Sequence, residues 1–387
     1  MKKVCVITST RADYGLLRKV IAGIQFSSKL KLQLVVTGTH LLPEYGDTFK
    51  EILSDGFVID RMIPIQINGN TEEANTISMG VALISFAKAL KELDSDLVII
   101  LGDRYEIIAV ALAAVMAGIP IAHIHGGEKT EGSIDELFRH SITKLSHYHF
   151  VAAKEYGDRI EQMGENPYYI YNVGGLGADN IASIELYDRS LIEEKLKVKF
   201  KKYNYLVTYH PETMKSSGIQ GDIKRLLSAL KEIQDAQIIF TMPNSDAASG
   251  KVLQEINYFI SNQNNAILFS SLGVKMYLSV MAQCNAVIGN SSSGIIEAPY
   301  LKVPTINIGY RQKGRLRSQS IIDCDGSLES IRSAFLKISD ERFISRIKNM
   351  TPAYGFPGAS DKIVKLIEEK ADSFGYIKIF NDLQLHT

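Results

Sequence analysis

Short apolar runs rich in Val and Ile alternate with amphipathic stretches of helical period along almost the whole sequence. Such runs predict buried strands, and the helical stretches between them predict parallel βαβ units. The first series of predicted strands is 4–8, 32–37, 97–101, 120–124 and 149–153, and the second is 205–209, 237–241, 266–269, 286–289 and 305–308. The pattern therefore predicts two α/β layers, each doubly wound and Rossmann-like.

The length of the chain also favours two domains. A chain of 387 residues is too long for one ordinary core and suits two domains of about 150 to 200 residues. The glycine-rich segment VGGLGADN follows Asn172 and is expected to act as a hinge. We expect domains at 1–174 and 175–360 with a ligand cleft between them, and a helix within 361–387 that packs back on the first domain.

The charge balance excludes some classes of partner. Forty-three basic residues match forty-three acidic ones, so no general field draws the protein to nucleic acid or to an anionic membrane. Any anionic ligand must be held by a local site. The N-terminus lacks the hydrophobic region of a signal peptide, and the sequence contains no apolar run long enough for a membrane span, so we expect a cytoplasmic protein.

The first predicted strand ends in TSTRADYG, which places Arg11 and Asp13 on a loop before a helix expected to start near Tyr14. A diphosphate would meet a guanidinium and free backbone N–H groups at such a loop. In the alternative reading, Asp13 only caps the helix and Arg11 is solvated. The dinucleotide fingerprint GxGxxG does not occur in this turn, which argues against a nicotinamide enzyme.

Two further polar groups follow predicted strands of the first series. Asp103 follows the strand LVIIL and Gly102, which permits close approach of a ligand, although Asp103 could instead cap the next helix. After the next strand come His123, His125 and Glu128, and we expect the two histidines to share one face of that strand. A metal is the obvious alternative, but neither HExxH nor Cys/His spacing is present, so we expect no metal and no cofactor.

The helix expected after this cluster carries Asp135 and Arg139, which lie one turn apart and could simply form a surface ion pair. In the second series, His210, Asn244 and Arg311 follow strands, although a structural histidine, an Asn-Ser-Asp turn and a solvated basic turn would explain each of them. The segment GNSSSG precedes a helix expected to contain Glu297. Its small residues and the helix dipole would suit a phosphate, although capping loops of this kind are common.

These segments occur in one characteristic order. TSTRADYG, LGDRYE, HIHGGEKT with DELFRHSITKLSHYHF, HPET, GNSSSG and RQKGR together resemble the hydrolysing UDP-N-acetylglucosamine 2-epimerases of sialic acid synthesis over nearly the whole chain. The resemblance implies a GT-B fold and a homodimer or homotetramer. It also implies UDP-N-acetylglucosamine as substrate, with UDP and N-acetylmannosamine as products.

The resemblance also implies roles for particular residues. Some relatives have Glu at the position of His125, and we expect His125 to stand in for that glutamate. The expected catalytic residues are Asp103, Glu128, Asp135, His125 and His210. The expected substrate contacts are Arg11, Arg104, Arg139, His210, Asn244, Ser291, Ser292, Gly294, Glu297 and Arg311.

The reaction implied by the resemblance is elimination of UDP to give 2-acetamidoglucal, followed by addition of water with inversion at C2. We expect Asp103 and Glu128 to transfer the protons. The alternatives are the homologue of the legionaminic acid pathway, which acts on UDP- or GDP-linked 2,4-diacetamido-2,4,6-trideoxyglucose, a GT-B glycosyltransferase, and a non-catalytic nucleotide-sugar sensor.

Overall fold

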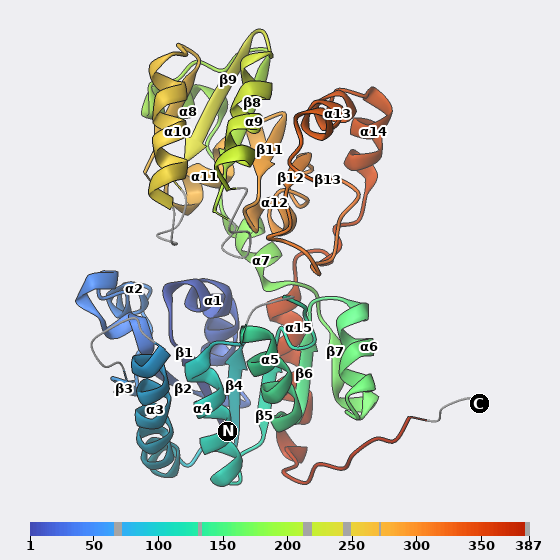
Figure 1. Cartoon of the computed structure of the whole chain (residues 1–387). Coiled ribbons are helices and arrows are strands. Elements are labelled where there is room, and N and C mark those ends of the chain that lie inside the picture. Colours follow the sequence, from blue (N-terminus) through green and yellow to red (C-terminus); the bar gives the residue numbers. More distant parts are fainter. Residues whose placement is uncertain (66–71, 131–133, 212–218, 243–248, 271, 384–387) are drawn as a thin grey trace. The chain divides into compact units, whose positions relative to one another are not determined.

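The computed structural model describes residues 1–65, 72–130, 134–211, 219–242, 249–270 and 272–383 (Figure 1). By its internal contacts the chain divides into two compact units. Unit 1 comprises Met1–Asn180 together with Tyr354–Thr387, and unit 2 comprises Ile181–Ala353. Among the described residues, no helix combines the length and the apolarity needed to cross a bilayer.

Unit 1 contains a sheet whose seven described strands are all parallel, in the order β3-β2-β1-β4-β5-β6-β7. The strands are β1 (Lys2–Thr8), β2 (Leu30–Thr37), β3 (Arg61–Ile63), β4 (Leu97–Leu101), β5 (Ile121–Ile124), β6 (Tyr148–Val151) and β7 (Ile170–Asn172). The α-helices are α1 (Arg11–Phe26), α2 (Phe49–Ser54), α3 (Glu72–Leu93), α4 (Tyr105–Met116), α5 (Ile134–Leu145), α6 (Lys154–Gln162), α7 (Leu176–Ser183), which crosses into unit 2, and α15 (Ala359–Lys370).

The alternation along β1 shows why this sheet is covered on both faces. Val4 and Val6 belong to one buried cluster, which includes side chains of α1 and α15. Cys5 and Ile7 belong to another, formed with α3, α4 and α5. Since successive strand side chains point to opposite faces, a continuously apolar strand requires a helical layer on each side.

The last described helix returns the chain to unit 1. In α15, Val364 packs against α1 so closely that a Cβ added at Gly23 would lie 2.7 Å from its Cγ2. Glu368 accepts a hydrogen bond from Ser27, which follows α1. Unit 1 is therefore built from two separate parts of the sequence.

Unit 2 repeats this architecture with a parallel sheet of six described strands, in the order β10-β9-β8-β11-β12-β13. The strands are β8 (Tyr203–Thr208), β9 (Ala236–Thr241), β10 (Ala266–Phe269), β11 (Ala286–Gly289), β12 (Thr305–Ile308) and β13 (Ile321–Cys324). The α-helices are α8 (Arg189–Leu196), α9 (Ile219–Lys231), α10 (Ser249–Ser261), α11 (Gly273–Gln283), α12 (Ser293–Ile296), α13 (Leu328–Ile338) and α14 (Glu341–Asn349).

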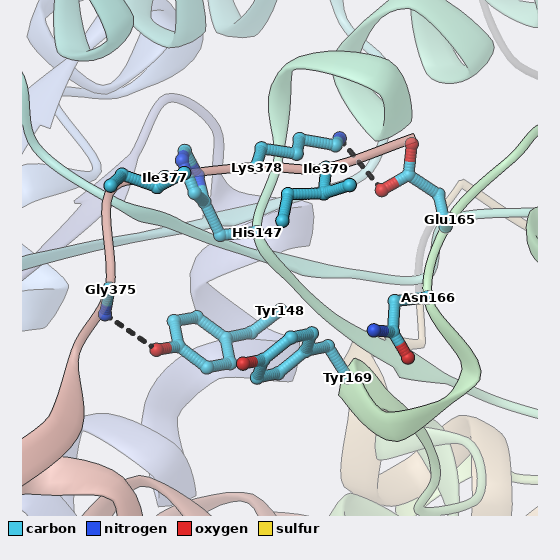
Figure 2. A pocket seen from close by; sticks show the side chains of 9 residues that line it. All are labelled: His147, Tyr148, Glu165, Asn166, Tyr169, Gly375, Ile377, Lys378 and Ile379. Atoms are coloured by element: carbon cyan, nitrogen blue, oxygen red, sulfur yellow. Dashed lines mark hydrogen bonds and ion pairs between the residues drawn. The ribbon is translucent and has the colours of Figure 1, made fainter. Parts of the chain in front are cut away.

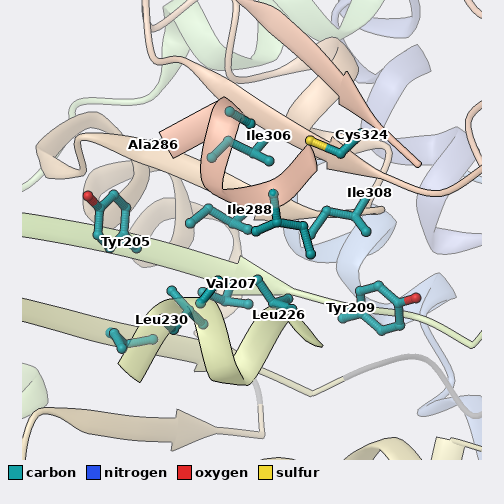
Figure 3. Packing of buried hydrophobic residues seen from close by; sticks show 14 of the residues in the cluster. Tyr205, Val207, Tyr209, Leu226, Leu230, Ala286, Ile288, Ile306, Ile308 and Cys324 are labelled. Carbon is teal, nitrogen blue, oxygen red and sulfur yellow. The ribbon is translucent and has the colours of Figure 1, made fainter. Parts of the chain in front are cut away.

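Figure 3 shows one face of the unit 2 sheet. Val207 of β8 and Ile288 of β11 pack there beside Leu226 and Leu230 of α9. On the other face, Leu206 belongs to a separate cluster that includes side chains of α8 and α11. The prediction of two doubly wound layers of parallel strands is therefore confirmed.

The strand order reverses at the same point in both sheets, between β1 and β4 in unit 1 and between β8 and β11 in unit 2. In open α/β sheets, ligands bind beyond the carboxyl ends of the strands at such a switch point. The segments that carry the predicted site residues follow β1, β4 and β5 in unit 1 and β8, β11 and β12 in unit 2. In each sheet, these polar segments therefore lie together at the carboxyl ends of the strands.

Candidate active site

The loop after β1 differs from the prediction. Helix α1 begins at Arg11, three residues earlier than expected, and Thr10 is its N-cap in a capping box with Asp13. The Asp13 carboxylate accepts hydrogen bonds from the backbone N–H groups of Ser9 and Thr10, which we had expected to be free for a diphosphate. Asp13 is therefore the N3 partner of Thr10 in the capping box of α1. Arg11 lies at the surface, where its Nε is 3.0 Å from Oε2 of Glu51.

Sequence reasoning missed the buried His40 beneath this loop. Its Nε2 lies 3.0 Å from the Thr8 hydroxyl and its Nδ1 lies 2.7 Å from the hydroxyl of Thr48. Burial alone would raise the pKa of Asp13, but hydrogen bonds from His40, Thr8 and the backbone outweigh burial and lower it. His40 therefore helps to fix the loop after β1, which we had predicted to bind a ligand. His40 follows β2 in the sequence, and only the fold brings it next to this loop.

Asp103 follows β4, as predicted, but it does not cap a helix, because Arg104 occupies the N-cap position of α4. The turn at Gly102 is held by His123, whose Nε2 lies 2.8 Å from the Gly102 carbonyl oxygen. Burial lowers the pKa of His123 to about 3, so this ring is neutral and donates to that carbonyl. His123 is a buried structural histidine that orients the segment bearing Asp103.

Arg139 is the hub of the unit 1 site. Its guanidinium donates to the Asp103 carboxylate and, at 3.0 Å each, to the carboxylate of Glu136, the carbonyl of Glu128 and the hydroxyl of Thr130. The residue is buried at 5% exposure. Arg139 thus joins the segments after β4 and β5 to helix α5, and its predicted contact with substrate stays a prediction.

His125 does not share a strand face with His123, because β5 ends at Ile124 and His125 has a positive φ of 65°. This conformation is uncommon for a residue other than glycine. Its Nε2 accepts from the Leu176 N–H at 3.4 Å, and its Nδ1 lies 2.9 Å from Oε1 of Glu128. The histidine and the glutamate of HIHGGE therefore form a pair.

The two glycines of HIHGGE are required by close packing. A Cβ at Gly126 would lie 2.9 Å from Nδ1 of His123, and one at Gly127 would lie 2.3 Å from the Tyr156 carbonyl oxygen. Gly127 also has a positive φ of 75°. The chain can therefore turn from β5 towards Glu128 only with very small residues at these positions.

The carboxylates of this site influence one another. Burial raises the pKa of Asp103, the Arg139 guanidinium opposes this, and the negative charges of Asp135 and Glu128 raise it further. Asp103 is therefore a desolvated carboxylate with an elevated pKa. Such a group can accept a proton from a weak acid more readily than an exposed aspartate.

Arg104 is also engaged within unit 1. Its Nε lies 2.5 Å from Oε1 of Glu106, a residue that is only 1% exposed. Burial alone would lower the pKa of Arg104, but the charge and hydrogen bond of Glu106 outweigh burial and raise it. The guanidinium therefore stays charged, and its contact with substrate stays a prediction.

Asn290 organises the site in unit 2, and sequence reasoning did not single it out. Its side chain accepts from the backbone N–H of His210 at 2.7 Å and donates to the His210 carbonyl at 2.8 Å. Its own carbonyl accepts from Gln312 Nε2 at 2.9 Å and from Arg311 Nη1 at 3.3 Å. Asn290 therefore joins the segments after β8, β11 and β12. Asn244 lies outside the described residues, and its predicted contact stays a prediction.

The serine loop after β11 depends on Gly289, where an added Cβ would lie 1.9 Å from the Thr208 carbonyl oxygen. The expected helix after this loop is only α12 (Ser293–Ile296), which ends before Glu297. Pro299 explains this early end, because proline disfavours helical structure at the residue before it. A helix this short adds little dipole, so the loop must rely on hydroxyl and N–H groups to hold an anion.

Glu297 carries an unsatisfied acceptor. Its Oε2 atom is buried without a hydrogen-bond partner within the described part of the chain, and burial raises the pKa of its carboxyl group. A buried acceptor without a donor costs about 1–3 kcal/mol, so a ligand that brings hydroxyl donors would be favoured here. Paired ribose hydroxyls have that chemistry.

Comparisons with known proteins identify the family of the chain. A family model described as UDP-N-acetylglucosamine 2-epimerase matches residues 23–368. The chain is 41% identical over 366 residues to the GDP/UDP-N,N'-diacetylbacillosamine 2-epimerase (hydrolyzing) of Campylobacter jejuni, covering 94% of each chain. It is 38% identical over 370 residues to the polysialic acid biosynthesis protein P7 of Escherichia coli, covering 95% of this chain and 94% of that protein.

The same relationship is seen in three dimensions. The crystal structure of UDP-GlcNAc 2-epimerase from Neisseria meningitidis bound to UDP-GlcNAc matches with a TM-score of 0.75 at 18% identity, covering 95% of this chain and all of that chain. The GT-B fold predicted from the resemblance is thereby confirmed. The chain belongs to the UDP-N-acetylglucosamine 2-epimerase family.

Proposed function

We propose that this protein is a hydrolysing 2-epimerase that converts UDP-N-acetylglucosamine into UDP and N-acetylmannosamine. The observation that carries the proposal is the cluster in which Asp103 is paired with the buried Arg139 and lies close enough to Asp135 and Glu128 for their charges to help raise its pKa. A carbon-bound hydrogen is a very weak acid, so its removal requires a desolvated base of this kind.

The proposed reaction has two steps. A carboxylate of the cluster, Asp103 or Glu128, takes the proton from C2 while the bond between C1 and the diphosphate oxygen breaks. The electrons of the C–H bond form the C1–C2 double bond of 2-acetamidoglucal, and UDP leaves with the electron pair of the C–O bond. Water then adds its hydroxyl to C1 and gives its other proton to a carboxylate of the cluster, while a proton from a carboxylic acid of the cluster reaches C2 from the opposite face. His125 can relay a proton through its pair with Glu128.

The leaving diphosphate needs cations and hydrogen-bond donors. We assign this role to Ser291, Ser292, His210 and Arg311 in unit 2, together with Arg11 after exchange of its partner Glu51. In the same assignment, Gly294 and Asn244 contact the nucleotide, Glu297 accepts from the ribose hydroxyls, and Arg104 contacts the substrate.

Replacing Asn290 with aspartate is expected to weaken UDP binding by about 10-fold or more. The new carboxylate would face the His210 carbonyl without a donor and would add a negative charge beside the diphosphate loop, which together cost about 1–3 kcal/mol. Isothermal titration with UDP measures the change. Asn285→Asp is the matched control at the opposite end of β11, because the side-chain oxygen of Asn285 accepts from the Asn204 N–H, a role that a carboxylate keeps. Equal affinity in both variants would remove Asn290 from the site.

A second substrate is favoured by a specific observation, the 41% identity to the diacetylbacillosamine 2-epimerase over 94% of both chains. The second candidate reaction is the same elimination and hydration on UDP- or GDP-linked 2,4-diacetamido-2,4,6-trideoxyglucose. The two substrates share the diphosphate and differ at C4 and C6 of the sugar. Residues near those two carbons would therefore decide between them.

Product analysis tests the proposal. We expect the purified protein to release UDP and free N-acetylmannosamine from UDP-N-acetylglucosamine with no acceptor present. Parallel incubations with the UDP- and GDP-linked diacetamido sugars compare kcat/KM for the two substrates. A much higher value for a diacetamido sugar would select the second candidate. Transfer of the sugar only to an added acceptor would instead identify a glycosyltransferase.

The proposal extends to assembly and location. The 42.9 kDa chain is expected to form a homodimer or homotetramer in the cytoplasm. Light scattering coupled to size exclusion measures the assembly, and a monomer at micromolar concentration would contradict it.

A further inference from the structure

The chain after α15 forms an extended strap over unit 1, comprising residues 375–381 (the C-terminal strap). At its start, the Gly375 N–H donates to the Tyr148 hydroxyl at 3.1 Å. At its end, the Asn381 N–H donates to the Gly164 carbonyl at 2.9 Å. Figure 2 shows the pocket that the strap encloses against β6 and the segment that follows α6.

Lys378 is the inward anchor of the strap. Its ammonium donates at 2.6 Å to the backbone carbonyls of Lys144 and Ser146, and it lies 2.7 Å from Oε2 of Glu165. These carbonyls belong to the C-terminal end of α5, where helix carbonyls have no intrahelical donor. A cation at this position satisfies them and also complements the helix dipole.

Burial of apolar side chains does not explain the course of the strap. Ile377 and Ile379, on either side of Lys378, are 87% and 77% exposed. Lys378, by contrast, has a side chain that is only 24% exposed. The strap thus leaves two isoleucines in solvent while it delivers one ammonium to the end of α5. Lys378 is its anchor at that helix end, beside the stacking of Tyr376 on His147 and the packing of Phe380 against Gly164.

Glu165 connects this anchor to the rest of unit 1. It is 2% exposed and is surrounded by three nitrogen groups: Lys144 Nζ of α5 at 2.6 Å, His149 Nε2 of β6 at 3.1 Å and Lys378 Nζ of the strap at 2.7 Å. Burial alone would raise the pKa of Glu165, but hydrogen bonds from these groups lower it to about 2. One ionised carboxylate therefore ties the strap, α5 and β6 together.

The opposite end of α5 carries the candidate active site. Asp135 and Glu136 lie in its first turn, and Arg139 follows one turn later. The helix has twelve residues and is about 18 Å long, so it transmits a shift or rotation at one end to the other as a stiff rod. Movement of Arg139 would displace the groups that it holds, Asp103 among them.

We propose that Lys378 is a positioning residue for the reaction. By fixing the C-terminal end of α5, it keeps Asp135 and Arg139 in place beside Asp103. The inference rests on the proposed function. Lys378 touches no reacting group. Its effect must therefore appear in turnover rather than in nucleotide binding.

Two variants test this role: Lys378→Met, and a chain that ends at Phe374. We expect kcat to fall about 10-fold or more in both, because small misplacements of catalytic groups are costly, while KM and the Kd for UDP stay within about two-fold. Lys378→Arg should recover most of the rate, since a guanidinium can donate to the carbonyls and to Glu165 together. Lys365→Met is the matched control, because Lys365 is an exposed lysine of α15 paired with Glu369.

Hydrogen exchange of α5 gives a readout that does not depend on turnover. We expect the amides of α5 to exchange faster in Lys378→Met than in the wild type and the Lys365→Met control. Normal turnover or unchanged α5 exchange in Lys378→Met would overturn the role of Lys378, and so would a parallel loss of kcat, UDP affinity and folded protein. A wild-type protein that releases no UDP from any of the nucleotide sugars would count against the proposed function instead, and α5 exchange would then decide the role of the strap.

Discussion

Asp103→Asn is expected to lower kcat by about 100-fold or more while the Kd for UDP remains close to the wild-type value, by the usual size of acid–base effects. The amide keeps the shape of the side chain but cannot take the C2 proton. Glu128→Gln should have a comparable effect, because it removes the second proton-transfer group and the carboxylate paired with His125. Steady-state kinetics with isothermal titration of UDP separates turnover from binding.

Asp94→Asn is the matched control for these variants. Asp94 lies before β4, at the amino end of the strand that Asp103 follows, and its exposed carboxylate pairs with Lys3. Its substitution should leave kcat unchanged. If both Asp103→Asn and Glu128→Gln turned over at near wild-type rates, neither residue would belong to the mechanism.

Arg139→Gln is expected to lower kcat at neutral pH by about 10- to 100-fold and to move the acidic limb of the pH–kcat profile to higher pH. Arg139 lowers the pKa of Asp103 by its charge and hydrogen bond, so removing it raises that pKa further. A base must be ionised to act, and activity is lost as the pH falls through its pKa. The raised pKa therefore causes this loss at a higher pH in the variant. A pH series of kcat for both proteins measures the shift.

Arg61→Gln is the control for Arg139→Gln, because Arg61 is an arginine of unit 1 on β3 whose exposed side chain lies 3.6 Å from Glu92. Its pH profile should match that of the wild type. An Arg139→Gln profile with an unchanged acidic limb would show that Arg139 does not control the ionisation of the catalytic carboxylate.

The central strands were predictable because they are buried on both faces and read as continuous apolar runs. The predictions at 97–101, 286–289 and 305–308 coincide with β4, β11 and β12, and the prediction at 266–269 coincides with β10, which is an edge strand and only partly buried. The short strands β3, β7 and β13 were missed. Each has only three or four residues and pairs along only one edge, so its sequence carries little periodic signal.

The site was predictable in its segments but not in its contacts. The position of polar residues after apolar strands indicated where Asp103 and Glu128 would lie. The partnership between Asp103 and Arg139 spans 36 positions and depends on how α5 packs beside β4 and β5. Asn290 gave only a weak signal, because one Asn within GNSSSG looks like any turn residue. Lys378 gave none, since its role depends on the backbone carbonyls that end α5.

The most direct test of the account is turnover in D₂O. We expect free N-acetylmannosamine released with UDP from UDP-N-acetylglucosamine to carry one solvent deuterium at C2, and Asp103→Asn and Glu128→Gln to release little labelled product. If one of the diacetamido sugars is the substrate, the same label is expected at C2 of its product. Released sugar without deuterium at C2 would contradict the removal of the C2 hydrogen by the carboxylate cluster.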